Sequence, residues 1–202
     1  MIPAAYIQEW SHKAPWPDLR QVEQDLIITR ALCDLFLSPT LSGKIAFRGG
    51  TAINKLLFQQ PLRYSEDIDL VQTHPRRYRS DGWQASPEYA NRDLFDLHEG
   101  LKQLSMHSDK LIACFEHYLA MEGKHISRAV AEQRMLKKLE RSLTEDVAPL
   151  LPAGIQFNDD DALLAFGRVW TELVTHFKGD PWKLSGQVID ELRNKKLPNL
   201  LR

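Results

Sequence analysis

Two chemically distinct segments lie close together between Phe47 and Leu70. The first reads Phe-Arg-Gly-Gly-Thr-Ala-Ile-Asn-Lys-Leu-Leu, and the second reads Arg-Tyr-Ser-Glu-Asp-Ile-Asp-Leu. Adjacent glycines before a helical pattern predict a strand-to-helix turn, and alternating carboxylates in an apolar run predict a short strand. The chain is therefore expected to build a glycine turn into a helix and, soon after it, a short strand with two acidic side chains.

The glycine turn has the residue types that a phosphate group requires. Glycine lets the backbone approach a ligand closely, and the first turn of a helix supplies unpaired N–H groups. We therefore expect Gly49, Gly50 and Thr51 to bind nucleotide phosphates, with Lys55 one helical turn later on the same side. The alternatives are a tight turn without a ligand for Gly-Gly-Thr, and an ordinary surface position for Lys55.

The second segment has the ligand chemistry of a divalent metal. Asp67 and Asp69 alternate along the predicted strand, so both carboxylates are expected on one face, about 7 Å apart along the strand. Such a pair suits Mg²⁺ or Mn²⁺, with nucleotide phosphates completing the coordination. Ser65 is expected on the same face, where its hydroxyl would contact a phosphate. The alternatives are an ordinary polar face of an edge strand for the aspartates and a simple strand start for Ser65.

Composition excludes several other classes of protein. The 202 residues suffice for one domain or two small lobes, and the net charge of -1 gives no overall attraction to nucleic acid or membranes. No apolar run approaches the roughly 20 residues needed to span a bilayer, and the N-terminus has no signal-peptide pattern. Cys33 and Cys114 lie in apolar helical patterns, which predicts two buried thiols in a reducing compartment. We therefore expect a cytoplasmic protein with no membrane partner.

The N-terminal half alternates helical and strand patterns. Asp18 is the expected N-cap of a helix over 19–37, and strands are predicted over 44–48 and 67–71 on either side of a helix over 51–59. Ile68 and Leu70 are expected on the strand face opposite the carboxylates. The residues expected to face the core from the two helices are Val22, Leu26, Ile27, Ala31, Leu32, Leu35, Ile53, Leu56 and Leu57.

The remainder is predicted to be a loop followed by helices. Residues 72–91 form the loop, and its Arg76, Arg77 and Arg79 are interpreted as a solvated cluster, with phosphate steering as the alternative. Helices are expected from Asp93 to about 105, near 108–122, over 127–144 with Ser127 as N-cap, and from the Asp159-Asp160-Asp161 triplet to Lys178-Gly179. The triplet is interpreted as a helix cap, and metal binding is the alternative.

These segments resemble the AbiEii/AbiGii-type nucleotidyltransferase toxins of type IV toxin–antitoxin systems. The resemblance is carried by five segments and by the C-terminal helices. The segments are Met-Ile-Pro-Ala-Ala-Tyr-Ile at the start, Gln21-Val-Glu-Gln-Asp-Leu26, Ala46-Phe-Arg-Gly-Gly-Thr-Ala52, Arg63-Tyr-Ser-Glu-Asp-Ile-Asp-Leu-Val71 and Arg92-Asp-Leu-Phe-Asp-Leu97.

The resemblance implies a mostly helical α+β fold, in which a small polymerase-β-like strand–helix–strand core packs on a C-terminal helical bundle. The implied division is a nucleotidyltransferase-like lobe over 1–75, a linker over 76–91 and a helical lobe over 92–202. It also implies transfer of a nucleotidyl group from an NTP to tRNA or a protein with Mg²⁺, and a cognate antitoxin as partner. Carried over by motif, Asp67 and Asp69 would bind the metal, Ser65 would line the reacting phosphate, and Asp93 would be a further catalytic aspartate.

The interval between the two acidic motifs is shorter than the resemblance implies. Family members carry further strands there, with another acidic position and a functional lysine, whereas residues 72–91 contain no alternating apolar run and no lysine. The alternative function is therefore a catalytically impaired relative that binds a nucleotide or an antitoxin. A two-stranded sheet also leaves an open edge, which predicts pairing with a second copy of the chain.

Overall fold

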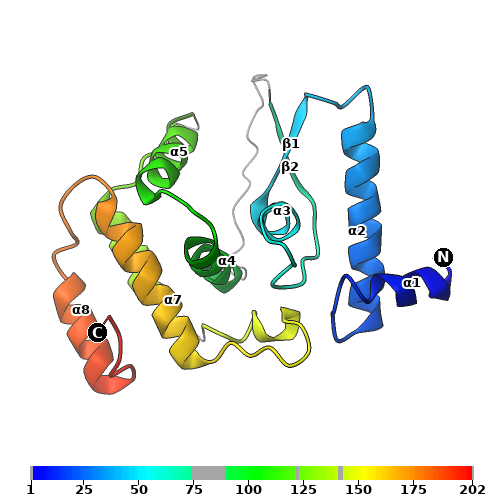
Figure 1. The fold of residues 1–202 in the computed structure, drawn as a ribbon. Helices are drawn as coiled ribbons and strands as arrows, with labels where there is room; N and C mark the ends of the chain where they lie inside the picture. The colour runs from blue at the N-terminus through cyan, green and yellow to red at the C-terminus, as the bar shows by residue number, and fades with distance from the viewer. Residues whose placement is uncertain (1, 74–89, 122, 141–142, 202) are drawn as a thin grey trace. The chain divides into compact units, whose positions relative to one another are not determined.

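The computed structural model describes residues 2–73, 90–121, 123–140 and 143–201, which form two compact units (Figure 1). Unit 1 comprises Met1–Tyr89 and Val147–Gln156, and unit 2 comprises Ala90–Asp146 and Phe157–Arg202. The described residues are mostly helical with one two-stranded sheet, which agrees with the predicted α+β class. The predicted linker over 76–91 lies largely outside the described residues, as do its three arginines.

Unit 1 contains the strands and the N-terminal helices. Its elements are α1 (Ala4–Trp10), α2 (Leu19–Leu37), β1 (Ile45–Arg48), α3 (Gly49–Leu56), β2 (Asp69–Gln72) and the short 3-10 helix η2 (Ala148–Leu150). Helix α3 packs against both strands, and α1 packs against α2. The segment containing η2 lies in sequence between two stretches of unit 2 but clusters with unit 1.

Helix α2 has the predicted bounds, but its buried face differs from the prediction. Asp18 caps it, because the Asp18 side chain accepts a hydrogen bond from the backbone N–H of Arg20 at 2.9 Å. The buried positions are Val22, Asp25 and Ile28, whereas Ile27 is 49% exposed, so the prediction for Ile27 was wrong. A carboxylate therefore occupies the middle of the buried stripe.

The two strands pair antiparallel, with Arg48 opposite Asp69 and Phe47 opposite Leu70. The prediction that β2 begins at Asp67 was wrong, because the strand begins at Asp69 and Asp67 lies in the irregular segment before it. Leu70, predicted on the strand face opposite the carboxylates, is 39% exposed. Asp69 and Val71, on the other face, are the more covered residues of this strand.

Helix α3 starts earlier and ends earlier than predicted. It begins at Gly49, directly after β1, and ends at Leu56. The expectation that Leu56 and Leu57 face the core was wrong, since both are exposed, at 67% and 54%. The buried residues of α3 are Thr51, Ala52 and Asn54, so two polar side chains face the interior.

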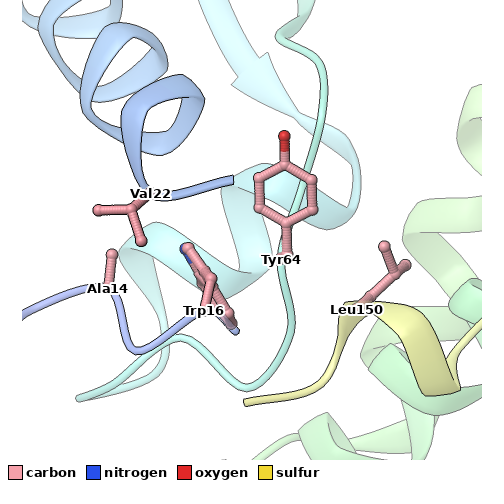
Figure 2. Close-up of a cluster of buried hydrophobic side chains, with 5 residues drawn as sticks. All are labelled: Ala14, Trp16, Val22, Tyr64 and Leu150. Atoms are coloured by element: carbon pink, nitrogen blue, oxygen red, sulfur yellow. The ribbon is translucent and has the colours of Figure 1, made fainter. Parts of the chain in front are cut away.

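A small hydrophobic cluster in unit 1 joins segments that are distant in sequence (Figure 2). Trp16 and Tyr64 pack edge to face with their ring centroids 5.9 Å apart, and Val22 of α2 and Leu150 of η2 belong to the same cluster. The backbone N–H of Tyr64 donates to the carbonyl of Leu150 at 2.7 Å. The chain entering β2 is therefore fixed by both aromatic packing and a backbone hydrogen bond.

Unit 2 is helical throughout its described elements. These are α4 (Ala90–Gln103), α5 (Ser108–Met121), α6 (Arg128–Lys138), α7 (Asp159–Glu172), the 3-10 helix η3 (Val174–His176) and α8 (Ser185–Lys195). Ser127 caps α6 as predicted, with its hydroxyl accepting from the N–H of Val130. The helix predicted up to Gly179 is interrupted after Glu172, and α8 was not predicted.

The aspartate triplet forms the first turn of α7, in agreement with its interpretation as part of a helix cap. Asn158 is the N-cap residue: its side chain accepts from the N–H of Asp161 at 3.0 Å, and the Asp161 carboxylate accepts from the N–H of Asn158 at 3.1 Å. This reciprocal pair is a capping box, and the three carboxylates lie at the positive end of the helix dipole. The triplet therefore has a structural role in its own helix.

Two expectations concern the surface of the protein. The prediction of buried thiols was wrong, since Cys33 on α2 and Cys114 on α5 are both exposed. Within the described part of the chain, every helix is too short or too polar to cross a bilayer.

Candidate functional site

The glycine turn and the carboxylate strand meet at Gly49 and Asp69. The sheet register places Asp69 opposite Arg48, the residue directly before the turn. Gly49 has φ +79°, in the left-handed region that glycine adopts readily. A Cβ atom at residue 49 would lie 3.1 Å from Cγ and 3.2 Å from Cβ of Asp69, and closer still to Oδ2. Glycine is therefore required here both by the backbone conformation and by the acidic side chain.

The second connection between the two segments runs through Thr51. Its hydroxyl donates to Oδ1 of Asp67 at 3.3 Å. Thr51 is buried, at 2% exposure, whereas Asp67 is exposed. Thr51 thus binds the Asp67 carboxylate from the buried side, and the carboxylate stays exposed to solvent and to ligands.

The carboxylate of Asp69 has a raised pKa. Burial raises the pKa of Asp69, and the negative charge of Asp67 raises it further, while the positive charge of Arg48 opposes both effects. Two carboxylates that repel each other on a partly covered surface suit a divalent cation, because the cation would remove the repulsion. The donor chemistry of Asp67 and Asp69 therefore fits Mg²⁺ or Mn²⁺. Among the residues that the structure describes, no group of three His, Cys, Asp or Glu side chains is arranged to hold a metal ion.

Ser65 does not share the exposed face of Asp67. It is buried, at 4% exposure, and its hydroxyl accepts a hydrogen bond from Nη1 of Arg63 at 3.3 Å. The same guanidinium nitrogen donates to the carbonyl of Tyr64 at 3.0 Å. Arg63 and Ser65 thus stabilise the chain leading to Asp67, and the predicted phosphate contact of Ser65 stays a prediction.

Lys55 is not a surface lysine. Its ammonium donates to Oδ2 of Asp25 at 2.9 Å and to the hydroxyl of Thr29 at 2.9 Å, and its side chain is 14% exposed. The alternative of an ordinary surface position is therefore excluded. Its predicted contact with a phosphate stays a prediction, and in this structure its ammonium is bound to two residues of α2.

Asp93 belongs to unit 2. It is an exposed residue in the first turn of α4, where its charge acts on Lys138. Burial lowers the pKa of Lys138, and the carboxylates of Asp93 and Asp146 oppose this effect. The catalytic role that the resemblance assigns to Asp93 stays a prediction.

Two polar residues near the site were missed. Asp25 is 3% exposed, and Asn54 is 1% exposed. The Asn54 amide donates to the carbonyl of Gly50 at 3.0 Å, and its oxygen accepts from the N–H groups of Leu62 and Arg63 at 3.0 and 3.3 Å. The burial of Asp25 could have been predicted from its position, because Asp25 lies three residues after the apolar Val22 on a helix face predicted to point toward the core.

The arrangement can be compared with known protein families. Comparisons with curated proteins and with solved structures gave no significant match. A family model described as "Nucleotidyl transferase AbiEii toxin, Type IV TA system" matches residues 30–88, a range that includes the glycine turn and both aspartates of the carboxylate segment. This match confirms the resemblance inferred from the sequence: residues 30–88 match the AbiEii nucleotidyl transferase toxin family.

Proposed function

We propose that the chain is a nucleotidyltransferase-type toxin whose NTP site is built by the turn at Gly49 and the carboxylates of Asp67 and Asp69. The observation that supports this most strongly is the contact between Gly49 and Asp69, reinforced by the bond from Thr51 to Asp67. Both motif halves of the family-matched segment converge through these contacts. A turn that served only to connect β1 to α3 would not require an acidic side chain against its glycine.

The turn would bind the phosphates of the nucleotide. Residues at the start of α3 have backbone N–H groups without partners inside the helix, and the helix dipole adds a partial positive charge there. Gly50 and Thr51 would direct these groups at a phosphate, as in other sites at helix N-termini. The buried Thr51 would at the same time keep Asp67 oriented.

Asp67 and Asp69 would hold Mg²⁺ or Mn²⁺. A bound cation of this kind would neutralise negative charge on the phosphates of the NTP. The contribution of the protein is to fix two carboxylates beside the phosphate-binding turn. Because the pKa of Asp69 is raised, protons would compete with the cation at a higher pH than at an ordinary carboxylate.

The reaction would be a displacement at the α-phosphorus of the NTP. The oxygen of an acceptor hydroxyl forms a bond to this phosphorus, the bond to the bridging oxygen breaks, and pyrophosphate leaves with the electron pair. The hydroxyl proton passes to solvent. The acceptor would be tRNA or a protein, and the match to a toxin family of type IV toxin–antitoxin systems supports a cognate antitoxin as partner.

Transfer of label from NTPs tests this function. Purified protein would be incubated with each of the four α-³²P-labelled NTPs, Mg²⁺ or Mn²⁺, and either total tRNA or a cell extract. Label is expected in RNA or protein with the wild type, and is expected to be lost in Asp67→Asn and Asp69→Asn. The matched control is Asp34→Asn, the same substitution at an exposed carboxylate of α2 in the same unit. Full incorporation by Asp67→Asn would contradict the proposed site.

The alternative is a relative that binds a nucleotide or an antitoxin without catalysis. The short interval over 72–91, which lacks any lysine, favours it. It would give nucleotide binding that depends on Asp67 and Asp69, with no transferred label to any acceptor or from any of the four NTPs. Both functions therefore predict nucleotide binding, but only the first predicts transfer of label to an acceptor.

A further inference from the structure

Helix α2 contacts both halves of the proposed site through two adjacent residues. The Asp25 carboxylate binds Lys55 of α3 at 2.9 Å, and the side-chain amide of Gln24 donates to the backbone carbonyl of Glu66 at 3.1 Å. Lys55 lies one turn after Thr51, and Glu66 directly precedes Asp67. Both residues of α2 lie outside the family-matched range of 30–88, and neither has a role in the proposed chemistry.

The Asp25 carboxylate is buried, and both of its oxygens have partners. Oδ1 accepts from the indole N–H of Trp10 at 2.9 Å, and Oδ2 accepts from the Lys55 ammonium. The Thr29 hydroxyl, one turn along α2, accepts from the same ammonium and donates to the Asp25 carbonyl at 2.8 Å. A buried charge is tolerated only when it is paired and hydrogen-bonded, so this network has one well-defined geometry.

Fixing Lys55 fixes the start of α3. The helix has only eight residues, and Lys55 is its seventh. Leu56 and Leu57 are exposed, so the C-terminal end of α3 is held largely by buried polar contacts, those of Asn54 and the ion pair of Lys55. A shift of Lys55 would therefore move the whole short helix, including the glycine turn at its other end.

The Gln24 contact acts on the other half of the site. Glu66 lies in the segment before β2, outside the two strands of the described residues. The side-chain amide of Gln24 donates a hydrogen bond to the carbonyl of Glu66, the residue directly before Asp67. Because Gln24 and Asp25 are consecutive on one helix, the same part of α2 fixes the positions of both halves of the site.

We infer that Gln24 and Asp25 are positioning residues that set the distance between the glycine turn and the carboxylate segment. Neither residue is expected to contact the nucleotide or the metal. Their effect on catalysis rests on the proposed function, whereas their effect on the geometry of α3 and of the Glu66 segment does not.

Hydrogen–deuterium exchange of the full chain tests the geometric part directly. The exchange of peptides covering 48–56 and 64–68 would be compared among wild type, Asp25→Asn, Gln24→Ala and Ile28→Ala. Ile28 is buried on the same helix and outside the network, so Ile28→Ala is the control for general destabilisation of α2. Affinity for a fluorescent NTP analogue in Mg²⁺ would be measured on the same samples, below the melting temperature of each.

Exchange over 48–56 is expected to rise about tenfold or more in Asp25→Asn, as local opening becomes easier, and to stay near wild type in Ile28→Ala. Affinity for the NTP analogue is expected to fall about 10–100-fold in Asp25→Asn, which corresponds to about 1.4–2.8 kcal/mol, because the glycine turn would no longer be held against the carboxylate segment. If Asp25→Asn fails to fold, Gln24→Ala alone tests the positioning role, since it removes only an exposed hydrogen bond. Exchange over 64–68 is expected to rise in Gln24→Ala.

Equal exchange over 48–56 in Asp25→Asn and Ile28→Ala would overturn the positioning role, as would unchanged exchange over 64–68 in Gln24→Ala. Absence of NTP binding by the wild type would instead overturn the proposed function, while the exchange data still decide the positioning role.

Discussion

The side chain of Asp69 packs against the Cα of Gly49 so closely that residue 49 has no room for a Cβ. This contact joins the first residue of α3 to the first residue of β2. Gly49 also has a positive φ of +79°, which side chains other than glycine rarely adopt. The glycine and the acid are therefore one structural feature.

Gly49→Ala is expected to destabilise unit 1 more than the same change at another left-handed glycine. Gly43 has φ +73°, and a Cβ at residue 43 would meet no atom within 4 Å, so Gly43→Ala adds backbone strain alone, about 1–2 kcal/mol. Gly49→Ala adds the same strain and overpacking against Asp69, a further cost of about 1–3 kcal/mol. Denaturant unfolding of both variants measures the difference. Equal losses for the two variants would contradict the close packing of Asp69.

Thr51→Val is expected to weaken nucleotide binding with little loss of stability. Valine has nearly the shape of threonine but cannot donate to Asp67, and loss of one hydrogen bond to an exposed carboxylate costs about 1 kcal/mol or less. The affinity for Mg²⁺–NTP is expected to fall about tenfold, which corresponds to about 1.4 kcal/mol. Thr51→Ser retains the hydroxyl and is expected to bind like the wild type. Equal affinities for the valine and serine variants would show that the hydroxyl has no role.

The Asp25–Lys55 pair is expected to behave as a coupled unit in unfolding. Lys55→Met leaves a buried carboxylate without its cation, and breaking such a pair costs about 3–5 kcal/mol. Asp25→Asn is expected to cost a similar amount for the same reason. The double variant removes both charges, so its loss is expected to be smaller than the sum by about 1–3 kcal/mol. Additive losses across this double-mutant cycle would mean that the two side chains do not interact.

Much of unit 1 could be predicted from residue patterns, and the errors have physical causes. The N-cap at Asp18, the full length of α2 and the existence of both strands, though not the start of β2, follow from capping chemistry and periodicity. The inward faces do not, because periodicity identifies a helix but not the partner that covers it. Leu56 and Leu57 are exposed because Thr51, Ala52 and Asn54 occupy the covered side of α3.

The candidate site was predictable as a set of motifs but not as a set of contacts. The sequence places Gly49 and Asp69 near each other only if the register of the sheet is known, and a shift of one residue would separate them. The burial of Asp25 depends on Lys55, which lies 30 residues later in the chain. Such long-range charge pairing leaves no local pattern, which is why the sequence indicated only a phosphate contact or a surface position for Lys55.

In unit 2, the stability of the helical bundle is expected to depend on pH through Glu132. This carboxylate is 1% exposed, and although burial acts to raise its pKa, hydrogen bonds from Ser185, Arg128 and the N–H of Trp182 outweigh burial and lower it. A depressed pKa in the folded state means that the stabilisation is present above the ordinary pKa of 4.5 and is lost as the pH falls through the depressed value.

The matching variant is Glu132→Gln. At pH 7 it is expected to lose about 2–3 kcal/mol, because hydrogen bonds to a charged group become bonds to a neutral one. The gap from the wild type is expected to shrink as the pH is lowered below 4.5. Glu191→Gln, at a largely exposed carboxylate of α8, is the control and is expected to have little effect at any pH. A gap that is constant from pH 7 to pH 3 would show that Glu132 is not stabilised as a carboxylate.

Titration calorimetry of NTP binding, with and without Mg²⁺, tests the proposed NTP site in wild type, Asp69→Asn and Asp34→Asn. The wild type and Asp34→Asn are expected to bind the NTP more tightly with Mg²⁺ than without it, and Asp69→Asn is expected to lose this dependence. Metal-dependent binding that is unchanged in Asp69→Asn, or the absence of NTP binding by the wild type, would contradict an NTP site formed by the glycine turn and the carboxylate segment.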